Sequence, residues 1–197
     1  VNSAGLKQEL FAEYAKNYEF DYCVAVDGDG DRIVLSDAKG RIFTGDDILY
    51  TLASRNKMIG KEQSESVIGT TMSNQGVVEA LGKLGISFLR TDVGDKYISR
   101  ELVKHDLNVG AEPSGHIIQR EFSESGDANI ALIQTLAALQ ELDTTIEEIK
   151  KNINYKPLSL RNFSVADKKV IESQIFIESI EKLQKNYPDA RISVRKS

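Results

Sequence analysis

Short apolar runs alternate with amphipathic segments through the middle of the chain. The runs at 66–71, 86–91 and 107–111 have the length of buried strands, and the segments 74–84 and 94–104 between them have apolar residues at helical spacing. Strands that alternate with helices in this way pair in parallel, because each helix carries the chain back across the sheet. The pattern therefore predicts an α/β fold with a parallel sheet and crossover helices, whose ligand sites lie at the carboxyl ends of the strands.

The rest of the chain carries the same two kinds of element. Thr44, followed by Asp46 and Asp47, predicts a helix start, because carboxylates in a first turn favour the positive end of the helix dipole. The further predicted elements are a helix at 6–17, a buried strand at 22–26, strands at 33–35 and 41–43, helices at 128–142 and 145–152, a linker at 154–165, a helix at 167–186 and a strand at 190–195. The elements after the linker are too few for a self-sufficient domain, so we expect a C-terminal unit that is cut short.

Charge and cysteine content exclude several classes of protein. The 197 residues carry a net charge of −5, which argues against a general affinity for nucleic acid or for anionic membranes. Cys23 is the one cysteine, so an internal disulfide is excluded, and no apolar stretch approaches the roughly 20 residues of a membrane span. The given sequence starts at Val1 and not at an initiator methionine, and its first residues have no signal-peptide pattern. We therefore expect an internal piece of a longer cytoplasmic protein with no nucleic-acid or membrane partner.

Three aspartates alternate with glycine directly after the first predicted strand. In the run Asp27-Gly28-Asp29-Gly30-Asp31-Arg32, the glycines allow the backbone to curl so that the three carboxylates converge, and hard oxygen ligands select Mg²⁺, Ca²⁺ or Mn²⁺. An EF-hand is excluded, because its loop needs Gly and Glu where this chain has Arg32 and Ala38. An acidic surface turn is the alternative. In the metal interpretation Arg32 faces a phosphate that completes the metal shell.

Three further loops follow predicted strands. Glu112, Ser114 and His116 combine a carboxylate, a hydroxyl and an imidazole, which suits binding of a polyol such as a sugar, although an ordinary turn has the same composition. Ser73 and Asn74 open a predicted helix, where backbone N–H groups can meet an anion; the default interpretation is that Ser73 caps the helix. Asp95 has the same setting and the same two interpretations.

Taken together and in this order, these stretches resemble the α-D-phosphohexomutase superfamily, most closely its bacterial phosphoglucosamine mutase branch. The motifs that carry the resemblance are Asp27–Arg32, Thr71–Asn74, Arg90–Tyr97, Glu112–His116 and Ser125-Gly126-Asp127. Arg195-Lys196-Ser197 resembles the opening of the phosphate-binding loop of that family. The resemblance implies a mixed, mostly parallel sheet with crossover helices, flanked by partial α/β domains. It divides the chain into the end of domain 2 (1–42), domain 3 (43–153) and the start of domain 4 (154–197).

The resemblance also implies an intramolecular phosphotransferase. Such an enzyme interconverts glucosamine 6-phosphate and glucosamine 1-phosphate through a phosphoserine and a bisphosphate intermediate, in the synthesis of cell-wall precursors. The residues that it implies are Asp27, Asp29 and Asp31 for Mg²⁺, Arg32 as the catalytic phosphoryl clamp, Glu112, Ser114, His116, Asp95, Ser73 and Asn74 for the substrate, and Arg195 and Ser197 for the distal phosphate. The phosphoserine belongs to a domain outside this chain, so the partners are the phosphosugar and the missing domains of the same polypeptide. We expect the chain alone to be inactive.

Two alternatives remain at this point. A phosphoglucomutase/phosphomannomutase shares the metal loop and the sugar loop, but such relatives usually carry histidine after Val-Gly, where this chain has Asp95. Pro113 also departs from the Gly-Glu-Gln-Ser-Gly-His form of the sugar loop that is common in phosphoglucosamine mutases, and it stiffens the loop. The second alternative is a non-catalytic module that binds a divalent metal or a carbohydrate.

Overall fold

The computed structural model describes residues 8–188 and 190–194. The chain divides into two compact units, residues 1–157 and residues 158–197. The first unit holds two sheets. Its small antiparallel sheet has the order β1 (Tyr22–Val26), β2 (Ile33–Asp37), β3 (Ile42–Phe43), and its second sheet has the order β5 (Ser87–Thr91), β4 (Ser66–Thr70), β6 (Val109–Ala111), β7 (Ile117–Gln119). The domain boundary between residues 42 and 43 stays a prediction.

The larger sheet is mixed and mostly parallel, which confirms the predicted α/β class. β4 pairs in parallel with β5 and β6, and only β7 runs antiparallel, in a hairpin with β6. The sequence analysis did not predict β7, which has three residues directly after the polar turn. The loop at 112–116 is therefore the turn of a hairpin rather than the start of a crossover.

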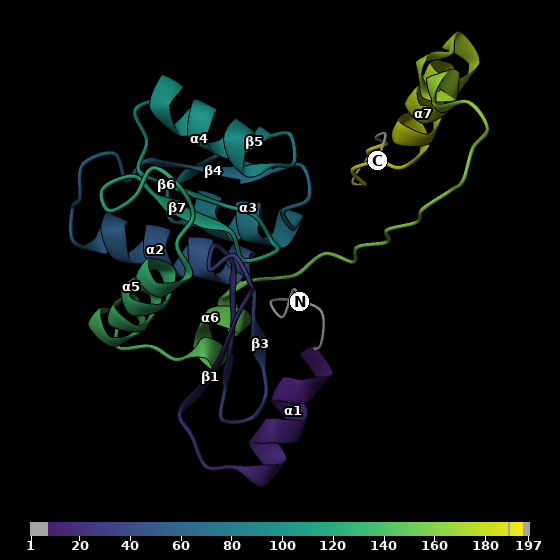
Figure 1. The fold of residues 1–197 in the computed structure, drawn as a ribbon. Coiled ribbons are helices and arrows are strands. Elements are labelled where there is room, and N and C mark those ends of the chain that lie inside the picture. Colours follow the sequence, from purple (N-terminus) through teal and green to yellow (C-terminus); the bar gives the residue numbers. More distant parts are fainter. Residues whose placement is uncertain (1–7, 189, 195–197) are drawn as a thin grey trace. The chain divides into compact units, whose positions relative to one another are not determined.

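Helices cover both faces of this sheet (Figure 1). α4 (Asp95–Lys104) packs on one face against Ile68 and Ile118. The opposite face belongs to the main core, which is formed with α2 (Gly45–Met58), α3 (Gln75–Lys83), α5 (Ala128–Glu141) and α6 (Ile146–Asn152). Gly110 allows the close approach of α4, since a Cβ there would lie 2.5 Å from Ile98 Cγ2.

Capping residues begin two of these helices, at Thr44, which the sequence predicted as a helix start, and at Thr145, where a predicted helix range began. The carboxylate of Asp47 accepts hydrogen bonds from the backbone N–H and the hydroxyl of Thr44, at 2.6 and 2.7 Å. Thr145 and Glu148 form a reciprocal capping box at the start of α6. Both helix starts are therefore decided within four residues of sequence.

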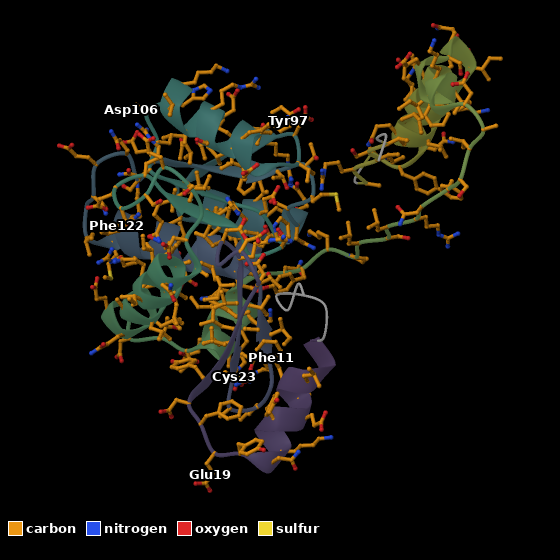
Figure 2. All side chains as sticks on the ribbon, in the orientation of Figure 1. Phe11, Glu19, Cys23, Tyr97, Asp106 and Phe122 are labelled. Atoms are coloured by element: carbon orange, nitrogen blue, oxygen red, sulfur yellow. The ribbon has the colours of Figure 1, made fainter. Side chains whose placement is uncertain are left out.

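The small sheet departs from its prediction in one respect. β1 is an edge strand whose side chains Tyr22 and Val24 are 38% and 36% exposed, so the prediction that it is buried is wrong. Its other face packs on α1 (Gln8–Asn17), where Phe11 is buried against Val34 and next to Cys23 (Figure 2). Cys23 thus packs as a small apolar side chain, as predicted.

The second unit corrects two predictions. The helix expected over 167–186 is split by Ser173 into a 3₁₀ helix, η1 (Lys168–Glu172), and α7 (Gln174–Asn186), because the Ser173 hydroxyl caps the N–H of Phe176. Residues 190–194 form no strand, so the strand predicted at 190–195 is wrong over its described part. The segment alternates apolar and polar residues as a strand does, but neither sheet of the described residues includes it. None of the helices in the described part of the chain has both the length and the apolar character needed to cross a bilayer.

Candidate functional site

The Asp27–Arg32 loop folds back on its own first carboxylate. Asp27 is buried, and its Oδ1 accepts hydrogen bonds from the backbone N–H groups of Asp31 and Arg32, at 3.2 and 3.1 Å. Its Oδ2 lies 2.9 Å from Arg32 Nε. Burial raises the pKa of Asp27, but the N–H groups and the guanidinium outweigh it and hold the pKa below its ordinary value. Gly30 makes the turn possible, since its φ is +74°.

The structure does not bring the three carboxylates of this loop together. Asp31 Oδ2 lies 3.2 Å from His116 Nδ1, and Asp29 is exposed to solvent. In the described part of the chain, no three histidine, cysteine, aspartate or glutamate side chains are grouped so that they could hold a metal ion. Arg32 and two backbone N–H groups bind the Asp27 carboxylate, where we expected a cation.

One oxygen of the loop nevertheless fits a missing cation. Asp31 Oδ1 is buried and has no hydrogen-bond partner among the described residues; Arg32 Nε lies 3.6 Å from it. A buried carboxylate oxygen without a donor is costly, and a hard cation is a ligand that satisfies it. The donor chemistry of the loop, three carboxylates within five residues, therefore fits Mg²⁺.

The hairpin turn at 112–116 lies directly against this loop. Arg32 and His116 form an isolated antiparallel bridge, and the N–H of Ile33 donates to Gly115 O at 3.0 Å. Gly115 has a φ of +93°, and a Cβ there would lie 2.0 Å from Ile33 O. His116 is 5% exposed, and Gly126 leaves the space for its ring. Two loops that are distant in sequence thus form one site, with a glycine at each close approach.

Glu112, the first residue of the hairpin turn, reaches the start of α4. Glu112 Oε1 accepts the N–H of Gly94 at 2.7 Å, and Ser114 Oγ lies 3.2 Å from Glu112 Oε2. Asp95, the first residue of α4, is exposed, and its Oδ1 accepts the N–H of Lys96. The structure therefore places Glu112, Ser114 and the start of α4 at the same edge of the sheet.

The loop between β4 and α3 is built differently from its prediction. Ser73 does not cap α3; its buried hydroxyl accepts the N–H of Thr70 at 3.2 Å. The cap is Asn74, whose Oδ1 accepts the N–H of Gly76 at 2.9 Å. The capping prediction was displaced by one residue because serine and asparagine are equally good caps and stand side by side.

A buried carboxylate and an arginine hold this loop from two sides. Asp46 is 4% exposed, and its Oδ2 accepts the backbone N–H of Asn74 at 2.7 Å. Arg90 donates to Thr70 O and Ser73 O, at 2.9 and 3.0 Å. Burial raises the pKa of Asp46 to about 6, aided by the charge of Asp47 and opposed by hydrogen bonds from Asn74 and Ser73 and by the charge of Arg90.

Sequence reasoning treated Asp46 only as a helix-start carboxylate. The signal that could have found it is the run Ile48–Ala53, which is apolar around most of the helix and so predicts a buried helix. The first turn of a buried helix is buried as well, and a carboxylate there needs specific donors. Arg195 and Ser197, which the sequence assigned to a phosphate, lie outside the described residues.

Comparisons with known proteins agree with this arrangement. The family model described as phosphoglucomutase/phosphomannomutase, alpha/beta/alpha domain III, matches residues 44–155. The phosphoglucosamine mutase of Hahella chejuensis is 42% identical over 159 residues, which are 81% of this chain and 36% of that protein. The phosphoglucosamine mutase of Oceanobacillus iheyensis is 32% identical over 96% of this chain and 43% of its own length. The chain thus spans less than half of the length of these curated relatives.

Solved structures share the fold at lower identity. A structure of N-acetylglucosamine-phosphate mutase in the product complex has a TM-score of 0.76 at 18% identity, covering 100% of this chain and 47% of that one. The N-acetylphosphoglucosamine mutase of Aspergillus fumigatus, in complex with GlcNAc-6P and magnesium, has a TM-score of 0.74 at 20% identity, covering 94% of this chain and 45% of its own. At these identities the likeness establishes the fold.

Proposed function

The chain belongs to the phosphoglucomutase/phosphomannomutase family, within the α-D-phosphohexomutase superfamily, and from that premise we propose that it is part of a phosphoglucosamine mutase. The observation that carries the proposal is the junction of the two loops. Arg32 and His116 pair through their backbones, and Asp31 contacts the His116 ring, so a phosphate held at the first loop adjoins a sugar held at the second.

Each loop has a distinct part in this proposal. Glu112, Ser114 and His116 bind sugar hydroxyls, and Arg32 binds the phosphoryl group that is transferred. Asp27, Asp29 and Asp31 hold Mg²⁺, which when bound neutralises charge on the phosphoryl oxygens. Ser73, Asn74 and Asp95 border the substrate, and Arg195 and Ser197 bind the distal phosphate.

The phosphoserine and the bisphosphate reorientation require parts of the polypeptide that this chain does not contain. Phosphoryl transfer depends mostly on positioning, so we expect the 197-residue chain alone to give background turnover in a coupled assay with glucosamine 6-phosphate and a bisphosphate activator. Reproducible turnover by the chain alone would contradict this assignment of the active site.

Titration calorimetry with Mg²⁺ tests the metal part of the proposal. We expect the combined variant Asp27→Asn, Asp29→Asn, Asp31→Asn to lose binding, because amides cannot balance the cation's charge. The matched control removes three exposed carboxylates elsewhere, with Glu13→Gln, Glu19→Gln and Asp21→Asn, and keeps the same net charge as the test variant. Equal Mg²⁺ binding by the wild type and the loop variant would refute the assignment of the loop.

Substrate choice separates the proposal from the phosphoglucomutase/phosphomannomutase alternative. A carboxylate at Asp95, with Glu112 nearby, favours a substrate that carries an ammonium group, a charge-assisted contact worth about 1.5–3 kcal/mol. We expect the intact enzyme to prefer glucosamine 6-phosphate at least about ten-fold in kcat/KM over glucose 6-phosphate and mannose 6-phosphate. Equal or reversed preference supports the alternative. A preference that survives Asp95→Asn keeps the mutase assignment and removes Asp95 from its explanation.

A further inference from the structure

The segment Asn154–Lys156, where the chain leaves the first unit, is bound by the side chain of Asn74. Asn74 Oδ1 accepts the backbone N–H of Lys156, and Asn74 Nδ2 donates to Lys156 O, both at 2.9 Å. The amide therefore pairs with both backbone groups of a single residue, as a neighbouring strand would. Since Oδ1 also accepts the N–H of Gly76, both lone pairs of the amide oxygen are used within the protein.

Side-chain contacts of Tyr155 and Lys156 support the same segment. The hydroxyl of Tyr155 donates to Asp47 Oδ1, and Lys150 Nζ lies 3.2 Å from Asp47 Oδ2. Burial and the charge of Asp47 raise the pKa of the Tyr155 phenol, which keeps it protonated as a donor. Lys156 Nζ also pairs with Glu79 Oε2 at 2.9 Å.

The backbone of this segment packs against α3 without a gap. A Cβ added to Gly76 would lie 2.1 Å from Asn154 O, a separation that no real side chain adopts. Gly82, in the same helix, has nothing within 4 Å of the corresponding position. Gly76 is therefore the residue that lets the segment lie on the first turn of α3.

Asn74 is itself held firmly, which makes it a fixed point for the segment. Asp46 accepts its backbone N–H, and Arg90 binds the carbonyl oxygen of the preceding Ser73. The contacts end at Lys156, and the first compact unit ends at the next residue, Pro157. The bonding pattern and the division into units thus locate the same point of the chain independently.

We infer that Asn74 is a positioning residue that fastens the 154–156 segment to the loop between β4 and α3, so that the chain leaves the first unit from a fixed point. Asparagine suits this position because its amide offers a donor and an acceptor side by side, in addition to the cap of α3. This role goes beyond the proposed mutase function and does not depend on it.

Hydrogen exchange on the 197-residue chain tests the inference. Asn74→Ser keeps a good helix cap but removes both bonds to Lys156, and Gly76→Ala displaces Asn154 while leaving Asn74 in place. We expect the Lys156 amide to exchange at least about ten-fold faster in both variants, and chymotrypsin to cleave faster after Tyr155. Gly82→Ala is the matched control, the same substitution in the same helix, and should leave both rates unchanged.

Comparison with global stability separates positioning from a merely structural role. Asn74→Ser should change the free energy of unfolding in urea, and the exchange rates of the other protected amides of the unit, far less than it changes the exchange rate of the Lys156 amide. Unchanged exchange at Lys156 in Asn74→Ser, or an equal acceleration at all protected amides, would overturn the inference. If the Lys156 amide exchanges faster in Gly76→Ala but not in Asn74→Ser, Asn74 is not the residue that positions the segment. If Asn74→Ser does not fold, Gly76→Ala decides. Wild-type rates of Lys156 exchange and of cleavage after Tyr155 in this variant overturn the inference, and an increase of both rates that is confined to this segment supports it.

Discussion

Asp46 should make the stability of the first unit depend on pH in a direction opposite to that of most carboxylates. Its side chain is buried, one oxygen accepts the N–H of Asn74, and the other, Oδ1, has no hydrogen-bond partner within the described part of the chain. Burial is the largest influence on its pKa, which rises from 3.8 to about 6. Well below pH 3.8 both the folded and the unfolded chain hold the proton, so Asp46 has no effect on the pH dependence of their free-energy difference.

As the pH rises above 4, the unfolded chain releases this proton before the folded chain does. The unfolded state then binds fewer protons, and linkage requires the free energy of unfolding to fall until Asp46 ionises in the folded state as well. A shift of about 2 units at 1.36 kcal/mol per unit gives a loss of about 3 kcal/mol, complete by about pH 7. Asp46→Asn removes this dependence, while its carbonyl oxygen still accepts the N–H of Asn74.

Urea unfolding of the wild type and of Asp46→Asn at half-unit steps from pH 4 to pH 7 measures the effect. Asp46→Asn also buries an amide N–H₂ group, which lowers stability by about 1–3 kcal/mol at every pH if it finds no acceptor. The informative quantity is therefore the slope: the stability of the wild type relative to the variant should fall by up to about 3 kcal/mol over this range. Asp21→Asn, on the exposed surface, is the control and should give a flat difference. A flat difference for Asp46→Asn would refute the reasoning.

Two further predictions concern the site. Gly115→Ala should lower the free energy of unfolding of the first unit by several kcal/mol, because a Cβ would lie 2.0 Å from Ile33 O. The control is Gly60→Ala, at a position that also has a positive φ, of +66°, but has open space around it; it should cost only about 1–2 kcal/mol in chemical unfolding. Similar losses for the two variants would contradict the role of the close approach. Arg90→Lys should accelerate hydrogen exchange in residues 71–75 about ten-fold, because one lysine Nζ cannot take the places of both Arg90 Nη1, which donates to Thr70 O and Ser73 O, and Nη2, which donates to Gln75 Oε1. Exchange at the wild-type rate would show that the loop does not need the guanidinium.

Much of the fold follows from patterns within a few residues of sequence. The alternation of apolar runs and helical spacing between residues 66 and 111 predicted the parallel strands, and Thr44 and Thr145 marked two helix starts, because caps and periodicity act over one turn. The errors have the same origin. Nothing local distinguishes Ser73 from Asn74 as a cap, and an apolar run such as Tyr22–Val26 reads as buried even where it forms a sheet edge.

The sequence by itself determined the chemistry that is available, and the tertiary structure decided which groups meet. Asp31 contacts His116 across 85 residues of sequence, and Asn74 binds Lys156 across 82. The sequence contains the three carboxylates of the first loop, but only the fold shows that Arg32 neutralises one of them and that one oxygen of Asp31 has no donor among the residues that the structure describes. Local backbone preferences are decided by neighbouring residues, whereas the partner of a buried polar group depends on which groups the packed sheets and helices bring within about 3 Å.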